Sequence, residues 1–236
     1  MSGTVREMKR VTRSILRLGP ADHGMPISLE EFEQADGEEG HRYEIIEGRV
    51  YVSPLPELPH EDLEHWLFIK LLDYGKAHPQ YVQRVSNQAR IFVPERRLAT
   101  CPEPDIAVYR KYPLRMARWM RSWRMVSPVN VVEVLSPGNV DKDLERNVEL
   151  YLGVPSIREY WIVDQRVKQE HPSMIVYRRR GSRWQKPIHV APGGTYTTPL
   201  LPEFELKLDE SDAYSPACRA NLSFSLPVPV ARWAMV

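Results

Sequence analysis

The sequence predicts an α/β or α+β fold built on one main sheet. Short β-branched and aromatic segments alternate with a few helical patterns, and clusters of turn residues separate them. A chain of 236 residues is long enough for one such domain with appended ends. We expect an N-terminal arm without periodic pattern over residues 1–26, the folded domain over 27–210, and a C-terminal tail over 211–236.

The first half of the chain has clear local signals. Ser28 and Glu31 form a capping box, which predicts the start of a short helix. Residues 42–52 are typical of a β-hairpin with its turn at Glu47-Gly48. From residue 60 to 78 apolar side chains recur at helical spacing, which predicts one long amphipathic helix.

Strand signals dominate the second half. Strands are expected, in chain order, at residues 81–85, 89–93, 106–109, 129–135, 159–163, 174–177 and 184–190. A helix is expected from Asp143 to Leu152, where Gly153 is well placed to end it. Glycine and proline turns separate the last strands, which indicates extra antiparallel pairs toward the C-terminus.

The composition, with 42% hydrophobic and 27% charged residues, is that of an ordinary globular protein. The formal net charge is +1, so nucleic-acid binding would require a local basic patch. No apolar run approaches the roughly 20 residues of a membrane helix. Cys101 and Cys218 fit neither a disulfide framework nor a zinc-ligand pair, and we expect a cytoplasmic protein.

Glu133 is the most informative single residue. It lies inside residues 129–135, an apolar run typical of a central strand that is buried on both faces. An ionised carboxylate there is costly unless it is paired or binds a metal. A metal site and a salt bridge to a buried arginine have close to equal weight from this residue alone.

Asp105 supplies a second acid. It follows Glu103-Pro104 and opens the expected strand 106–109, although an aspartate after proline is more often a turn residue. Adjacent strands that carry Asp105 and Glu133 would bring two carboxylates to one cation. Hard divalent ions such as Mg²⁺ prefer oxygen ligands of this kind.

Four ordered motifs carry a resemblance to a known family. They are Tyr-Glu-Ile-Ile-Glu-Gly at 43–48, Pro-Asp-Ile-Ala-Val at 104–108, Val-Glu-Val-Leu-Ser-Pro at 132–137, and Gly-Val-Pro at 153–155 followed by Glu-Tyr-Trp-Ile-Val-Asp at 159–164. Over residues 27–208 the chain resembles the Uma-type family of restriction-endonuclease-like proteins in the PD-(D/E)XK nuclease superfamily. Several motifs in order are far more specific than any single one.

The resemblance implies a restriction-endonuclease-like mixed central sheet flanked by helices, with a metal site at one edge. Glu44, Asp105 and Glu133 match the family's acidic positions, and His60 matches a histidine that opens the long helix. The implied cofactor is Mg²⁺ or Mn²⁺, held by Asp105 and Glu133, and the implied partner is nucleic acid, with DNA the expected substrate. Related nuclease domains often pair to cut two strands, which is compatible with a homodimer.

The chain departs from the family's pattern at its lysine. The superfamily lysine lies two residues beyond the glutamate, where this chain has Leu135. In the Uma-type family the lysine lies on the next helix, at the position that Asn147 occupies here. Asn147 cannot supply a positive charge, and Lys142 and Arg146 are the nearby candidates to replace it, although both residue types are more often solvated charges.

A basic segment separates the two acids. It contains six basic residues and no acid over residues 110–124, with Trp119 and Trp123 on one side if it is helical. Its arginines could contact phosphates and its tryptophans could stack on bases, or the segment is a solvated helix anchored by its tryptophans. The expected nucleic-acid contacts are Arg115, Arg118, Arg121 and Arg124.

Two functions follow from these observations. The first is a divalent-metal-dependent endonuclease that hydrolyses phosphodiester bonds in DNA, with Glu44, Asp105, Glu133, Asn147 and Lys142 as candidate catalytic residues. The alternative is a catalytically weakened nucleic-acid-binding or interaction module that retains the nuclease fold. The replacement of the family lysine by Asn147 is the reason to keep the alternative.

Overall fold

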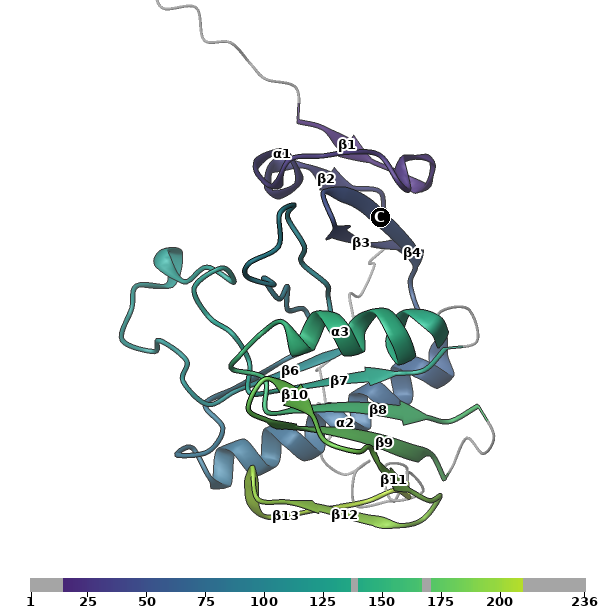
Figure 1. The fold of residues 1–236 in the computed structure, drawn as a ribbon, viewed down its shortest axis with the longest axis vertical. Helices are drawn as coiled ribbons and strands as arrows, with labels where there is room; N and C mark the ends of the chain where they lie inside the picture. Colours follow the sequence, from purple (N-terminus) through teal and green to yellow (C-terminus); the bar gives the residue numbers. More distant parts are fainter. Residues whose placement is uncertain (1–14, 137–139, 167–170, 210–236) are drawn as a thin grey trace, which may run out of the picture.

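A mixed seven-stranded sheet forms the centre of the protein (Figure 1). The computed structural model describes residues 15–136, 140–166 and 171–209. The strands of the sheet are β5 (Arg84–Ser86), β6 (Ile106–Tyr109), β7 (Asn130–Val134), β8 (Glu159–Asp164), β9 (Ser173–Arg180), β10 (Arg183–Trp184) and β11 (Ile188–Val190). Their order is β10-β9-β8-β7-β6-β5, and β11 also pairs with β9. Only β7 and β8 are parallel among these pairs.

Helices cover both faces of this sheet (Figure 1). Helix α2 (Leu58–Ala77) packs its apolar side on one face, against side chains of β6, β7, β8 and β9. Helix α3 (Asn147–Leu152) covers the other face and follows directly on a π-helical turn, Lys142–Arg146. The hairpin of β12 (Thr195–Thr198) and β13 (Leu201–Lys207) extends the core on the α2 side.

The N-terminal part adds a smaller layer beside the sheet. It consists of β1 (Arg17–Leu18), a 3₁₀ turn (Pro20–Asp22), α1 (Leu29–Gln34), β2 (Asp36–Gly37), β3 (His41–Ile46) and β4 (Arg49–Pro54). A β-bridge between Ile45 and Cys101 ties β3 to the segment that leads into β6. Strand β3 therefore presents its side chains to the end of the main sheet.

Several predicted elements are confirmed. Ser28 and Glu31 form the capping box at the start of α1. The hairpin β3–β4 turns at Glu47 and Gly48, whose φ angles of 50° and 70° are the left-handed values that such a two-residue turn requires. The long helix, the mixed sheet and the antiparallel strands toward the C-terminus are also present.

The strand expected at residues 89–93 is wrong. This segment makes only two backbone hydrogen bonds of a pairing kind, from Ile91 N to Pro102 O and from Val93 N to Thr100 O. Pro102 and Pro104 on the opposite segment have no N–H to donate, so a continuous ladder cannot form there. Ala89, Ile91 and Val93 are nevertheless buried, and this alternation explains why the pattern is that of a strand.

The helix considered for residues 110–124 is also wrong. Only a 3₁₀ turn, Arg118–Met120, forms in this segment, and the rest is irregular. The strand expected at 184–190 is divided into the short strands β10 and β11. Both segments lie on the surface, where packing imposes little regular structure.

The structure describes only part of the expected N-terminal arm and none of the expected C-terminal tail. Residues 1–14 of the expected arm and the tail 211–236 lie outside the described residues. The described end of the arm contributes β1, which pairs with β2, and its Leu18 is buried. The domain boundaries stay predictions. No helix among the described residues is long and apolar enough to cross a membrane.

Candidate active site

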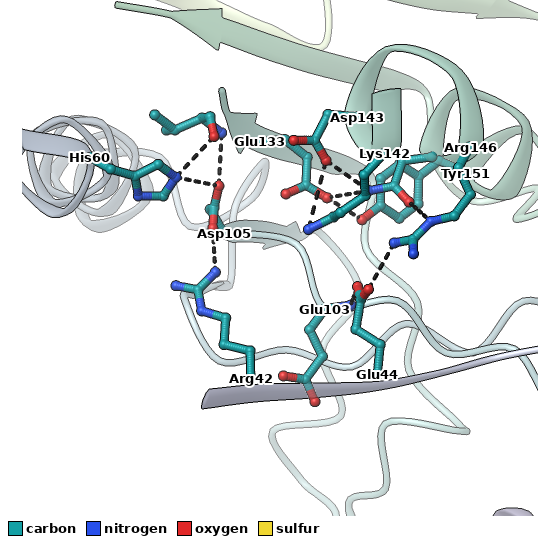
Figure 2. A network of polar contacts seen from close by, with 12 residues as sticks. Arg42, Glu44, His60, Glu103, Asp105, Glu133, Lys142, Asp143, Arg146 and Tyr151 are labelled. Atoms are coloured by element: carbon teal, nitrogen blue, oxygen red, sulfur yellow. Dashed lines mark hydrogen bonds and ion pairs between the residues drawn. The ribbon is translucent and has the colours of Figure 1, made fainter. Parts of the chain in front are cut away.

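Asp105 and Glu133 meet at the ends of two paired strands. Strands β6 and β7 are antiparallel with Ile106 opposite Val132, and one further residue along this register places Asp105 opposite Glu133. Opposite residues in an antiparallel pair have Cβ atoms about 4.5–5.5 Å apart. Both side chains are buried, at 3% and 1% exposed. Figure 2 shows Asp105 in contact with His60 and Arg42, and Glu133 in a neighbouring group of contacts that includes Tyr151.

The two oxygens of Asp105 have different surroundings. Oδ2 accepts a hydrogen bond from the backbone N–H of Val134 at 2.8 Å and lies 3.4 Å from Nε2 of His60. Oδ1 accepts from the guanidinium of Arg42 at 2.5 Å. Burial alone would raise the pKa of Asp105, but the His60 hydrogen bond and the charges of His60 and Arg42 hold this pKa below its usual range. Asp105 is therefore ionised and held in one orientation.

Glu133 is anchored through one oxygen only. Its Oε1 accepts hydrogen bonds from Nδ2 of Asn147 at 2.9 Å and from the hydroxyl of Tyr151 at 2.7 Å. Its Oε2 has no hydrogen bond from the part of the chain that the structure describes. Burial raises the pKa of Glu133 well above its ordinary value, and the nearby carboxylates Asp143 and Asp105 add to the effect. A cation bound beside Glu133 would relieve this cost.

Asn147 links two acids instead of providing a charge. Its side-chain amide donates to Asp143 at 3.1 Å as well as to Glu133. Asp143, Asn147 and Tyr151 follow one another at intervals of four residues, and the prediction that they share a helix face is confirmed by these contacts. Asn147 is fully buried, so the amide acts as a fixed positioning group for Glu133.

Lys142 brings the positive charge that Asn147 lacks. Its Nζ lies 3.8 Å from Oδ1 of Asp143, and Figure 2 shows the ammonium beside Glu133. Burial alone would lower the pKa of Lys142, but the charges of Glu133, Glu44 and Asp143 raise it above its ordinary value. The amine is therefore a permanent cation inside a group of carboxylates.

The π-helical turn explains how Lys142 reaches the site. Its backbone carbonyl accepts a hydrogen bond from the N–H of Asn147, five residues later. In a regular α-helix this bond would join residues four apart, and Lys142 and Asn147, five residues apart, would point about 140° away from each other. The wider turn aligns Lys142 with Asn147, so both side chains enter the same cluster.

Glu44 and Arg146 form the outer side of the cluster. Oε1 of Glu44 accepts from the backbone N–H of Glu103 at 2.8 Å, and Oε2 accepts from Arg146 at 2.8 Å. Burial alone would raise the pKa of Glu44, but Lys142 and Arg146 lower it. Arg146 also lies over the ring of Tyr51, and its Nε donates to Asn147. Nε and Nη2 of Arg146 are held by these contacts, while its Nη1 is buried without a hydrogen bond from the described residues, and Lys142 lies beside Glu133.

Carboxyl groups outnumber permanent cations in this cluster. Among the described residues the acids are Glu44, Glu64, Glu103, Asp105, Glu133 and Asp143, and the permanent cations are Arg42, Arg90, Lys142 and Arg146. Burial raises the pKa of four of these acids, Glu64, Glu103, Glu133 and Asp143, so a bound cation would favour their ionised forms. Carboxylate oxygens are the ligands that a hard dication such as Mg²⁺ prefers.

A second group of possible ligands is less suitable. His60, Glu64 and Asp105 offer ligand atoms within 4.8 Å of one another. However, the guanidinium of Arg42 bridges Glu64 and Asp105, at 3.3 and 2.5 Å. Nε2 of His60 lies 2.9 Å from the carbonyl oxygen of Val134, which requires a proton on Nε2, so this nitrogen cannot bind a metal. His60, expected beside the site, is thus a group that orients Asp105.

Comparison with known proteins shows the family of this chain. Residues 29–209 match the model of the Uma2 family, which is described as "Putative restriction endonuclease". The chain belongs to the Uma2 family. The resemblance inferred from the four sequence motifs is confirmed.

A solved structure supports the fold of this Uma2 protein. The chain is similar to a crystal structure from Anabaena variabilis ATCC 29413, described as "a putative nuclease belonging to DUF820", with a TM-score of 0.56 and 20% identity. The similarity covers 79% of this chain and 97% of that one. At this identity the likeness establishes the fold. No curated protein is similar enough in sequence to count as a relative.

The four arginines predicted to contact nucleic acid divide into two pairs. Arg121 donates to the carbonyl oxygens of Met116 and Leu114, and Arg124 pairs with Glu33, so both hold the irregular segment together. Arg115 and Arg118 are exposed and make no polar contact with the described residues.

The tryptophans of this segment do not share a face. Trp119 is 86% exposed, whereas Trp123 packs against Phe92 with ring centroids 6.3 Å apart. Their common orientation was expected only for a helix, and the helix does not form. Trp123 is therefore an anchor and Trp119 a surface group.

Two contributors were missed from the sequence. Arg42 and Glu64 join Asp105 in one ion-pair network. Glu64 lies four residues after His60 on α2, and this spacing was the available signal, because it places both side chains on one helix face. Arg42 gave no comparable signal, since its position depends on how the hairpin β3–β4 packs on the sheet.

Proposed function

We propose that the chain is a divalent-metal-dependent endonuclease that hydrolyses phosphodiester bonds in DNA. The observation that carries the proposal is the pair of buried carboxylates: Asp105, directly before β6, and Glu133 on the neighbouring strand β7, with Lys142 nearby. Membership of the Uma2 family supports the nuclease class.

Asp105 and Glu133 are the metal ligands in this proposal. Oε2 of Glu133 has no hydrogen bond from the described residues, and Oδ1 of Asp105 is held only by Arg42, whereas Oδ2 and Oε1 are held by groups inside the cluster. When bound, Mg²⁺ or Mn²⁺ polarises the scissile phosphate and lowers the pKa of the attacking water. The oxygen of Asp105 is reached by exchanging its contact with Arg42 for the ion.

Lys142 takes the role of the superfamily lysine. Since its pKa is raised, the ammonium keeps its proton and cannot act as a general base. It can donate hydrogen bonds to the attacking water and stabilise the negative charge that develops on the phosphate. Asn147 and Tyr151 fix Glu133, and Glu44 helps to hold Lys142 and Arg146 in place.

Arg115 and Arg118 are the proposed contacts to DNA phosphates. Both are exposed and have no carboxylate partner among the described residues. Arg121 and Arg124 act indirectly in this proposal, by shaping the segment that presents the other two. Loss of a phosphate contact weakens binding for all sequences alike and reduces its salt dependence.

Plasmid cleavage tests the proposed activity. Purified protein is incubated with supercoiled plasmid in Mg²⁺, in Mn²⁺ and in EDTA, and cleavage is expected only with a metal. Glu133→Gln should abolish cleavage, while Glu205→Gln on the exposed side of β13 serves as a control for loss of one acid. Cleavage that is equal in wild type and Glu133→Gln would refute the assignment.

The alternative is a binding module without catalysis, and the same purified protein can be used to test it. It predicts salt-sensitive DNA binding with no cleavage in any metal. The presence of Lys142 inside the carboxylate cluster favours the enzyme, because a chain that only binds DNA has no need of a buried ammonium beside two metal ligands.

A further inference from the structure

A cleft of about 780 Å³ opens next to the acid cluster. It is lined there by Arg42 and Glu64, which belong to the network around Asp105, and by Glu103, which pairs with Arg90. From there it passes the edge strand β5 and reaches Tyr109 and Tyr112 on the other side. A volume of this order suits a small ligand or a few units of an extended chain, not a double helix.

The far end of the cleft is aromatic and positively charged. The guanidinium groups of Arg84 and Arg121 lie 5.0 and 5.7 Å from the centre of the Tyr112 ring. Tyr109 meets Tyr112 edge-on, with centroids 5.8 Å apart. No carboxylate pairs with Arg84 or Arg121 in the described part of the chain. Arg121 is held by the carbonyl oxygens of Met116 and Leu114, so Arg84 is the guanidinium left for a phosphate.

Polar groups in the cleft also lack protein partners. Tyr109 is only 5% exposed, yet its hydroxyl makes no hydrogen bond with any described residue. Burial raises the pKa of Tyr109 to about 12, so the hydroxyl remains a donor. The side-chain amides of Asn87 and Gln88, on the rim, are likewise without a hydrogen bond from the described residues. Asn87 and Gln88 are exposed, so these amides and the Tyr109 hydroxyl are available to a ligand in the cleft.

We propose that this cleft binds unpaired nucleotides of a single DNA strand beside the scissile phosphate. Aromatic rings stack on bases, arginines contact phosphates, and amides and hydroxyls bond to base edges, and these three kinds of group occur together here. Bases within a duplex are stacked on one another and could not enter. The inference rests on the proposed function and adds a substrate class: DNA with a single-stranded segment.

Binding in EDTA tests the inference separately from cleavage. Fluorescence anisotropy is measured with a labelled single strand of about 12 nucleotides, within the range of site sizes known for such proteins, and with a blunt duplex of the same sequence. The variants are Tyr112→Ala, Tyr112→Phe and Arg84→Gln. Arg183→Gln, an exposed arginine on β10, is the control for loss of charge.

Tyr112→Ala should weaken binding of the single strand by about 5- to 150-fold, the loss that follows removal of one stacking side chain. Tyr112→Phe should retain the affinity, because it retains the ring. Arg84→Gln should lower the slope of log affinity against log salt by about 0.7, and Arg183→Gln should leave it unchanged. Duplex binding should be the same in all variants. Tyr112 is half-buried, and a thermal melt checks that each variant is folded.

Equal affinity of wild type and Tyr112→Ala for the single strand would overturn the inference, as would equal weakening toward the duplex. Neither result depends on catalysis, because no metal is present. A protein that binds as expected but never cuts plasmid would refute the proposed function alone. Plasmid cutting with no effect of Tyr112→Ala on strand binding would refute this inference alone.

Discussion

Replacement of Lys142 by methionine separates a catalytic lysine from a merely structural one. Methionine keeps much of the length and the apolar stem of the side chain but removes the charge. In the wild type the ammonium lies among the carboxylates of Glu133, Glu44 and Asp143, with its side chain 11% exposed. The substitution therefore leaves buried acids without their nearest cation.

Two losses are expected from this single change. Removal of one partner of a buried ion pair costs about 3–5 kcal/mol of unfolding free energy, because the remaining charge is left uncompensated. Removal of a group that stabilises charge in the transition state slows the reaction by about 10²–10³. Lys186→Met, at an exposed lysine, should produce neither effect and serves as the control.

A second variant keeps the two losses apart. In Lys142→Met combined with Glu133→Gln, the unpaired carboxylate is gone, so a large part of the stability should return. Activity should not return, since the double variant lacks both the lysine and a metal ligand. Urea unfolding followed by fluorescence gives the stability, and the rate of plasmid nicking in Mg²⁺ gives the activity of each protein.

The decisive result is the rate of Lys142→Met under conditions in which it is folded. Nicking at the wild-type rate would show that Lys142 only balances charge, and the mechanism proposed above would be wrong. An Arg146→Met variant that lost more activity than Lys142→Met at equal stability would transfer the role to Arg146, whose guanidinium bonds to Glu44.

Three further predictions concern Cys101, Gly37 and Glu64. Burial raises the pKa of Cys101 to about 12, so in a Cys218→Ser background its thiol should react with a thiol reagent at pH 8 only after unfolding; rapid reaction of the native protein would contradict this. A Cβ at Gly37 would lie 2.6 Å from Cε2 of Tyr43, so Gly37→Ala should cost about 1–3 kcal/mol by urea unfolding, and an unchanged midpoint would show that the ring can move. Burial, and then Asp105, raise the pKa of Glu64 from 4.5 to about 7, so the folded state holds a proton that the unfolded state has lost. The stability due to this group should fall as the pH rises from about 4.5 to about 7, and Glu64→Gln should flatten that part of the profile.

The sequence could predict that the two acids lie close together because side chains follow a regular pattern along a β-strand. Glu133 lies in an apolar run and Asp105 directly before another, and side chains alternate between faces along each strand. The sequence did not reveal the register between β6 and β7. The structure shows that Ile106 pairs with Val132. Local signals were similarly sufficient for α1 and for the β3–β4 turn, since a capping box and a Glu-Gly turn depend on neighbours in the chain.

Contacts between distant segments were not predictable in this way. Arg42 binds Asp105 across a separation of 63 residues. Its partner is decided by the packing of the β3–β4 layer on the end of the sheet, which no periodicity in the sequence describes. The strand prediction for residues 89–93 was wrong for a related reason. The apolar pattern indicated burial, but the prolines on the opposite segment have no N–H groups with which to form a continuous β-ladder.

The lysine illustrates the limit most clearly. If the helix were regular, Asn147 would occupy the position of the family lysine, and Lys142, five residues earlier, would lie on a different side of the helix. The hydrogen bond from Asn147 N–H to the carbonyl of Lys142 shows that the turn is one residue wider, which brings the two side chains together. A positive charge and an amide can thus divide between two residues the work that one lysine does in the family. If so, Asn147→Lys should destabilise the protein by placing a second ammonium in a fully buried position, and should not raise the rate of a chain that already has Lys142.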